Sequence, residues 1–315
     1  MTATPNRTPN YAPGRAGLRP LRRAPLRRAI ALAAAAALLG FATPSVDAQL
    51  LGNLDGGQPI DIAAADGIEW QRDARLYIAR GQATARQGDV LVEGDVLRAH
   101  YREAGDEGTT GAQAGIQADT QDSAAAPATG SRIWRVEAQG NVVIRTPTET
   151  AWGDTAVYDV DEGRLLMTGQ NLRLTTQNED ITARDSLEYL DGQRIAIARG
   201  DAVAIRGQER LEADILVAFF TEAGDNRVNR LEAVGHVEIR TPQDIVRGNE
   251  GVYDVDTGLA TVIGSVRLTR GQNQLNGEYA VVDLNTGVSR LFAAPPGTNA
   301  AGRRVQGLFL TEGGD

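Results

Sequence analysis

The chain has 315 residues, no cysteine and a formal net charge of −9. Residues 1–48 hold seven Arg and one Asp, so the remainder carries about −15, which argues against binding to nucleic acid or to an anionic membrane surface. Without cysteine no disulfide can form, so packing and backbone pairing must hold together a chain that is long enough to bury a sizeable core.

The N-terminal segment has the pattern of an export signal. Arginines between Arg15 and Arg28 precede an uncharged apolar run, Ala29–Ala42, and small residues follow at Val46 and Ala48. The run is 14 residues long, short of the roughly 18 to 20 that span a bilayer. We therefore expect residues 1–48 to be a signal peptide, cleaved after Ala48, and the protein to be periplasmic. A retained N-terminal anchor is the alternative.

Two long stretches of the remaining chain repeat each other. Residues 78–106 recur at an offset of 119, and residues 137–161 recur at an offset of 95. The difference of 24 residues falls in a stretch that is rich in Gly, Ala, Thr, Gln and Asp and has no periodicity. We predict a disordered insertion there, at 107–131.

A shorter unit recurs within both stretches. Six glycines sit in strand-like patterns rich in Ala, Thr, Val and Ile: Gly81, Gly140, Gly169, Gly200, Gly235 and Gly264. In five units a small residue follows 13 positions later and is itself followed by an acidic or amide residue, as in Gly94-Asp95. After Gly169 the acidic partner, Asp185, comes late, which suggests a bulge or a longer turn. A spacing of about 29 to 35 residues is typical of stacked supersecondary units.

The units contain alternating strands. Apolar and polar residues alternate over Arg135–Arg145, apart from Val143, and over Arg230–Arg240. Such a period of two with one polar face is typical of a half-buried antiparallel strand. Turn signals with a glycine follow several strands, and no segment after residue 48 shows sustained helical periodicity. The predicted fold is all-β and built of stacked antiparallel hairpins.

The chain carries no recognisable catalytic or metal-binding motif. Asp159–Gly163 and Asp254–Gly258 begin like calcium loops but lack the third ligand, the distal Glu and the flanking helices, so hairpin turns explain them better. His100 and His236 have no second His or Cys nearby and are interpreted as surface residues. A glycosidase-like carboxylate pair stays open, although the carboxylates recur at turns and outward positions. We expect no enzyme, no metal and no cofactor.

The order of the motifs resembles the LptA/OstA family. The resemblance begins with Ile60–Trp70, which contains Ala-Asp-Gly-Ile-Glu-Trp, and continues through Tyr77–Ala83 and Gly88–Val92. It returns at Ile181–Tyr189, before Gly200–Val203. The motifs cover most of the chain after residue 48, in two tandem copies.

This resemblance implies a fold, a function and partners. The fold is an open, twisted, V-shaped β-jellyroll of two OstA-like copies, 49–178 and 179–292, with a C-terminal tail at 293–315. The function is non-catalytic binding and transport of lipopolysaccharide, whose lipid A acyl chains are shielded in an apolar groove during outer-membrane assembly. The partners are lipopolysaccharide and the inner-membrane-anchored and outer-membrane export components, which dock by sheet-edge stacking. A second copy of the chain, docked head to tail, is a further partner.

Acyl chains can hold an anionic glycolipid on an acidic protein. Burial of ten methylenes contributes roughly 8 kcal/mol, whereas attraction of one interfacial charge contributes about 1 kcal/mol. The inward apolar column supplies the candidate groove residues: Leu97, Tyr101, Val142, Ile144, Tyr158, Val160, Leu216, Phe220, Val237, Ile239, Tyr253, Val255 and Val282. The alternative is a β-solenoid-like scaffold or adhesin whose core is filled by its own side chains.

Overall fold

The computed structural model describes residues 60–103, 132–221, 227–283, 285–286, 288–298, 300 and 302–310. The expected signal peptide, 1–48, and the expected insertion, 107–131, lie outside these residues. The described part is almost entirely antiparallel β-sheet, with one 3₁₀ turn, η1 (Asp191–Gln193), and no α-helix, so the all-β prediction is confirmed. In this part of the chain no helix is long and apolar enough to cross a membrane.

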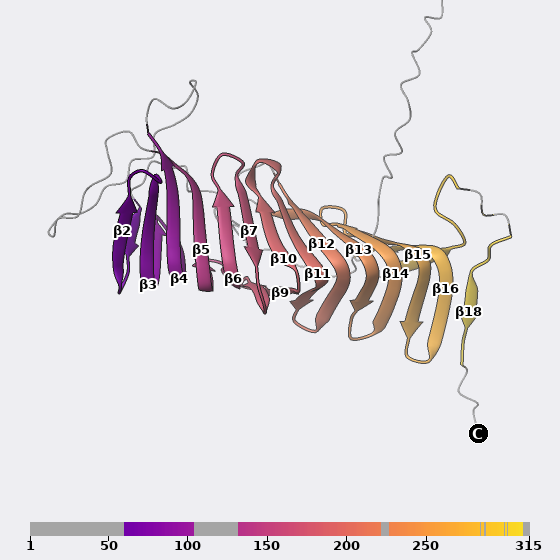
Figure 1. Ribbon diagram of the computed structural model, residues 1–315. Coiled ribbons are helices and arrows are strands. Elements are labelled where there is room, and N and C mark those ends of the chain that lie inside the picture. Colours follow the sequence, from indigo (N-terminus) through magenta and orange to yellow (C-terminus); the bar gives the residue numbers. More distant parts are fainter. Residues whose placement is uncertain are drawn as a thin grey trace, which may run out of the picture. The chain divides into compact units, whose positions relative to one another are not determined.

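One sheet contains all the strands of the described part, and most strands pair with their neighbours in the chain (Figure 1). The strands are β1 (Asp61–Ala63), β2 (Gly67–Gln71), β3 (Leu76–Gln87), β4 (Val90–Arg102), β5 (Arg132–Arg145), β6 (Thr150–Asp159), β7 (Arg164–Thr168), β8 (Leu172–Thr175), β9 (Glu179–Ala183), β10 (Ser186–Leu190), β11 (Ile195–Arg206), β12 (Glu209–Phe220), β13 (Val228–Arg240), β14 (Asp244–Asp254), β15 (Leu259–Arg270), β16 (Asn273–Asp283), β17 (Val288–Phe292) and β18 (Gln306–Leu308). The exceptions are pairs of short strands that share one long neighbour, such as β1 and β2 beside β3, and β7, which pairs with β10.

Five long strands, β3, β5, β11, β13 and β15, are interrupted by a glycine and the residue that follows it, both with positive φ. In β11 these are Gly200 (φ +83°) and Asp201 (φ +44°), and in β13 Gly235 (φ +79°) and His236 (φ +47°). The pairing register shifts at the same places. Elsewhere two short strands take the place of one long strand, and the gap between them lies beside these interruptions. The pairs of short strands are β1 and β2, β7 and β8, and β9 and β10.

We call the line of these breaks the corner. Arm 1 is the part of the sheet on the side of β1, β8, β9 and β18, and arm 2 is the part on the side of β2, β7, β10 and β17. Buried residues of both arms belong to the same clusters, so the inward faces of the two arms pack on each other.

Each of the six recurring glycines lies against an acidic or amide residue that precedes it in the chain: Asp66, Asp95, Asp154, Asp185, Asp214 or Asn249. A methyl group on Gly200 would lie 2.3 Å from Asp185 Oδ2 and 2.9 Å from the Asp185 backbone nitrogen. The Asp185 backbone N–H donates to the carbonyl of Arg199 over 2.9 Å. Gly169 follows the same rule, because its partner is Asp154. Asp185 comes late after Gly169 and still keeps the same relation to Gly200.

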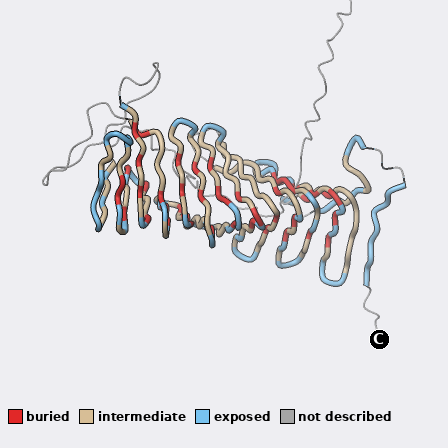
Figure 2. Tube along the Cα trace, in the orientation of Figure 1, coloured by how far each residue is buried: buried red, intermediate tan, exposed pale blue. Residues whose placement is uncertain are grey.

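The buried side chains form two main clusters, and exposed residues gather at the hairpin turns (Figure 2). The first cluster extends from β3 to β11 and includes Met167 and Leu172, both 0 % exposed. The second extends from β12 to β16 and includes Ile239 and Tyr253. A third, smaller cluster contains Tyr101. The core is thus divided between β11 and β12, although the sheet itself is continuous there.

The expected boundary between the two copies, at 178/179, falls between the end of β8 at Thr175 and the start of β9 at Glu179. The sheet passes through this point without interruption, since β8 pairs with β9. The position of the boundary stays a prediction. Within the expected tail, Gln306–Leu308 pairs with β16 on arm 1.

Candidate functional site

The inward faces of the two arms each carry a continuous row of uncharged residues. Members of a row lie directly opposite one another on successive strands, so their side chains share one face of the sheet. Row 1, on arm 1, consists of Ile62, Ala85, Val92, Ile144, Ala151, Leu174, Ile181, Ala204, Leu211, Ile239, Val246, Leu268, Leu275 and Gly307. Row 2, on arm 2, consists of Trp70, Tyr77, Ala99, Val136, Tyr158, Leu165, Tyr189, Ala196, Ala218, Leu231, Tyr253, Ala260, Val282 and Ser289.

Every predicted groove residue faces inward, into one of the three clusters. Most are covered by the protein's own side chains: Leu97, Tyr101, Val142, Ile144, Tyr158, Val237, Ile239, Tyr253 and Val282 are buried. The others are only partly buried: Val160, Leu216, Phe220 and Val255. Leu216 packs against both main clusters. Their orientation fits the prediction, whereas their contact with lipid stays a prediction.

Aromatic side chains fill the interior at the start of arm 2. The rings of Trp70 and Tyr77 stack with centroids 5.9 Å apart, and the ring of Tyr77 lies 5.0 Å from that of Tyr101. Trp70 Nε1 donates a hydrogen bond of 2.9 Å to Tyr101 Oη. Burial, and then the neighbouring Tyr101, raises the pKa of Tyr77. Alternation alone does not single out Trp70 and Tyr77 as groove residues, although both lie in the strands that carry the family resemblance.

The interior becomes polar at the ends of arm 1. Arg206 forms an ion pair with Glu179. Burial, and then the charge of Glu179, raises the pKa of the Glu149 carboxyl to about 7. Burial also raises the pKa of Glu209, against the opposing effect of Arg206. The uncharged rows are therefore bordered by ionisable groups on this side.

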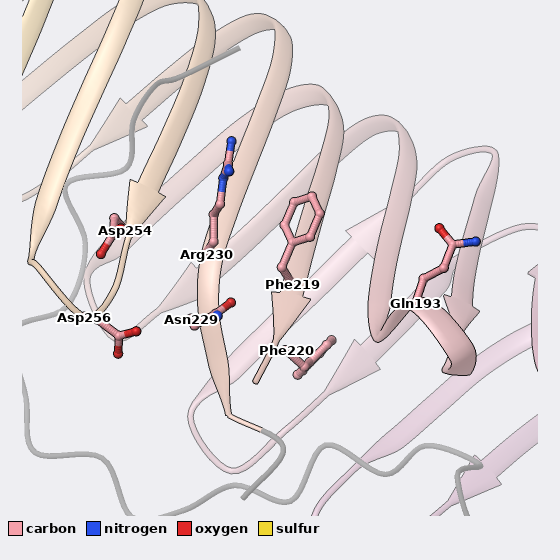
Figure 3. A pocket seen from close by; sticks show the side chains of 7 residues that line it. All are labelled: Gln193, Phe219, Phe220, Asn229, Arg230, Asp254 and Asp256. Atoms are coloured by element: carbon pink, nitrogen blue, oxygen red, sulfur yellow. The ribbon is translucent and has the colours of Figure 1, made fainter. Parts of the chain in front are cut away.

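A pocket of about 400 Å³ lies at the ends of arm 2 (Figure 3). Its lining consists of Gln193, Phe219, Phe220, Asn229, Arg230, Asp254 and Asp256. The guanidinium of Arg230 lies 5.5 Å from the centre of the Phe219 ring, and it pairs with Glu232. With two aspartates and one arginine in its lining, the pocket disfavours phosphate, while its amides and carboxylates suit hydroxyl groups.

The two segments that begin like calcium loops form hairpin turns. Asp159 and Asp254 accept turn N–H groups, from Glu162 over 3.0 Å and from Thr257 over 2.8 Å. In the described ranges, which omit 104–131 and 222–226, no group of three or more His, Cys, Asp or Glu lies together. The carboxylates of these segments therefore serve the turns.

The two histidines differ from each other. The His236 side chain is 90 % exposed, as expected, and its Nδ1 lies 2.9 Å from Asp214 Oδ2. His100 is partly buried, contrary to its interpretation as a surface residue, because its ring packs 5.7 Å from that of Trp134.

Comparisons with known proteins identify both copies. Residues 62–190 and 180–288 each match the family model described as LptA/(LptD N-terminal domain) LPS transport protein. A similar solved structure is LptH, the LptA homologous periplasmic component of the lipopolysaccharide transport device of Pseudomonas aeruginosa. It is 21% identical, covers 43% of this chain and 96% of its own, and has a TM-score of 0.37. No curated protein matches the chain.

Proposed function

The chain belongs to the LptA/(LptD N-terminal domain) family of LPS transport proteins, and from this premise we propose that it is a non-catalytic, periplasmic lipopolysaccharide-binding bridge. It would shield lipid A acyl chains between the two arms while it links inner- and outer-membrane export components. The observation that supports this most is the continuity of rows 1 and 2, which cross the sheet from its first strands to its last without a charged residue.

The composition of the rows supports binding through the acyl chains. Each buried methylene contributes about 0.8 kcal/mol, so a short length of one chain outweighs the repulsion between an acidic protein and a phosphate. Polar groups at the ends of arm 1, such as the Arg206–Glu179 ion pair, border row 1, which leaves the sugar and phosphate of a glycolipid in contact with water. In this arrangement the tails carry the affinity.

Neighbouring residues on opposite faces of β12 provide a test. Leu216 faces inward and is partly buried, whereas Val217 faces outward. A photo-crosslinking residue in place of Leu216 is expected to capture lipopolysaccharide in cells, with at least tenfold less capture from position 217. Similar capture from both positions would contradict an interior path.

One observation favours a second candidate, a scaffold with a self-filled core. Most of the predicted groove residues are buried by the protein's own side chains, among them Ile144 and Val237, each 1 % exposed. In a scaffold, the crosslinker at position 216 would capture only protein.

Edge stacking is supported by a junction inside the chain. β9 and β10 are the second-copy counterparts of β1 and β2, and they pair with β8 and β7. β17 and β18 follow β16 in the same way that β7 and β8 follow β6. The same register between two molecules would place residues of β17 and β18 in the first molecule opposite residues of β2 and β1 in the second. The pairs would be Ser289 with Trp70, Arg290 with Glu69, Leu291 with Ile68, and Gly307 with Ile62.

That register is chemically complementary. It continues both rows from one molecule into the next, sets Arg290 opposite Glu69, and covers Ile68, which is 50 % exposed. We propose that the chain stacks head to tail in this way and that family partners use the same two edges. Unpaired sheet edges are able to add a strand from another chain.

Cysteine substitution tests the register directly, because the chain has no cysteine of its own. Glu69→Cys combined with Arg290→Cys is expected to give a ladder of disulfide-linked oligomers under mild oxidation. Arg290→Cys alone should stop at dimers, and Glu69→Cys with Ser289→Cys, which places the second thiol on the inward face, should crosslink far less. Equal ladders from both double variants would contradict the proposed register.

A further inference from the structure

The pocket at the ends of arm 2 lies at an irregularity in the pairing of β12 with β13. Phe219 lies directly opposite Arg230. The next residue, Phe220, lies opposite Val228, so Asn229 has no residue opposite it and forms a β-bulge. Such an extra residue changes the direction of the side chains around it, and bulges are frequent next to binding sites. Here the bulge places the Asn229 side chain in the lining of the pocket (Figure 3).

The first copy has a large ring at the same place. At the offset of 95, Trp134 corresponds to Asn229. The backbone is equivalent in the two copies. The Trp134 carbonyl accepts from the Val160 N–H over 2.9 Å, and the Asn229 carbonyl accepts from the Val255 N–H over the same distance. The indole of Trp134 packs against the His100 ring, with the ring centres 5.7 Å apart. An amide is much smaller than an indole, so the second copy keeps the bulge and has room for a ligand beside it.

The amide of Asn229 offers a hydrogen-bond acceptor to a ligand. Its Oδ1 is buried, and no residue of the described part donates a hydrogen bond to it. A buried acceptor without a donor destabilises the protein, so a ligand that donates to it gains affinity. Gln193 adds an amide to the lining, and Asp254 and Asp256 add carboxylates. The pocket therefore suits a ligand that carries several hydrogen-bond donors.

The charges around the pocket favour a neutral ligand. Asp256 pairs with Arg227 over 2.9 Å, and Asp254 lies directly opposite Arg230 on the neighbouring strand. Arg230 also pairs with Glu232. The carboxylates of this group outnumber the guanidinium groups by one, which disfavours an anion, whereas the two guanidinium groups disfavour a metal ion. Hydroxyl groups both donate and accept hydrogen bonds, so a neutral ligand rich in hydroxyls matches the lining.

The rings of Phe219 and Phe220 supply the apolar part of the lining. The Arg230 guanidinium lies 5.5 Å from the centre of the Phe219 ring, and the Phe220 ring meets that of Tyr189 edge to face at 6.1 Å. These contacts hold both rings in place. A pyranose sugar has a face of C–H bonds, which packs on an aromatic ring, and a rim of hydroxyl groups. The volume of about 400 Å³ is in the range of small-molecule sites.

We propose that this pocket binds a pyranose unit of a neutral glycan, at a site separate from the inward rows. The ring of Phe219 packs against the C–H face of the sugar, Asn229 Oδ1 accepts a hydrogen bond from one hydroxyl group, and the two aspartates accept from others. The site does not depend on the proposed function, because Phe219 and Arg230 face outward, away from rows 1 and 2. The second copy then has a binding role that Trp134 excludes from the first.

The test uses the substitution that the repeat itself supplies. With the purified chain produced without residues 1–48, saturation-transfer NMR is expected to detect binding of at least one of three neutral trisaccharides, maltotriose, cellotriose and chitotriose. Asn229→Trp, which introduces the residue of the first copy, should weaken that binding at least tenfold. Val157→Trp adds the same side chain to the outward face of β6, away from the pocket, and should leave binding unchanged.

Three results would overturn the glycan site. The first is binding that Asn229→Trp leaves unchanged in a folded protein. If that variant does not fold, Phe219→Ala replaces it, because removal of the ring should cause a similar loss. The second is the absence of binding for all three trisaccharides at millimolar concentration. The third is displacement of the bound trisaccharide by lipopolysaccharide, which would make the pocket part of the lipid path.

The glycan site and the proposed function fail separately. A photo-crosslinking residue at position 216 should capture lipopolysaccharide equally well with and without Asn229→Trp. Loss of that capture in the folded variant would contradict the separation of the pocket from the interior. Trisaccharide binding without any lipopolysaccharide capture would support the glycan site and contradict the proposed function.

Discussion

Replacement of Gly200 by alanine is expected to destabilise the fold by about 3 kcal/mol or more. Gly200 has φ +83°, which costs an L-residue roughly 1–2 kcal/mol, and the added methyl group would lie 2.9 Å from the Asp185 backbone nitrogen. That nitrogen donates to Arg199 within the sheet, so the contact cannot be relieved by rotation of a side chain alone. Strand β10 would have to move away from β11 at the corner.

Gly207 is the matched control. It also has positive φ, +58°, but nothing lies within 4 Å of a methyl group built on it. Gly207→Ala should therefore cost only about 1–2 kcal/mol of backbone strain. The two free energies of unfolding are compared by urea denaturation followed by far-UV circular dichroism. Equal losses would show that the contact between the acidic residue and the following glycine does not constrain the corner.

Local patterns are enough to predict the strands and the face that each residue occupies. Alternation across Arg135–Arg145 and Arg230–Arg240 depends only on neighbours in sequence, and the structure places Ile144 and Ile239 inward as expected. The tandem copies are visible because equivalent positions of a repeat keep equivalent residues. The same repetition marks the corner glycines, although it does not reveal their role.

Contacts between strands are harder to predict. The sequence pattern associates Asp185 with Gly169, the glycine before it, whereas in the structure Asp185 lies against Gly200 on the next strand. The spacing along the chain does not state which strand lies beside which. The degree of burial is not visible either. The pattern marks Ile144 and Leu216 alike as inward, yet the first is 1 % exposed and the second keeps accessible surface. That difference depends on which side chains the other strands place over each residue, and alternation along one strand does not carry this information.

The central claim is that acyl chains bind in the interior and carry the affinity. The most direct test compares the binding of intact and fully deacylated lipopolysaccharide to the purified chain produced without residues 1–48. If only five methylenes are buried, their loss removes about 4 kcal/mol, so the deacylated molecule is expected to bind at least about 1,000-fold more weakly.

The salt concentration is varied in the same measurement, since binding through acyl chains should depend little on ionic strength. The account predicts a large loss on deacylation and a small effect of salt. Equal affinity for the intact and the deacylated molecule would show that sugar or phosphate carries the binding, and would contradict a lipid path along rows 1 and 2.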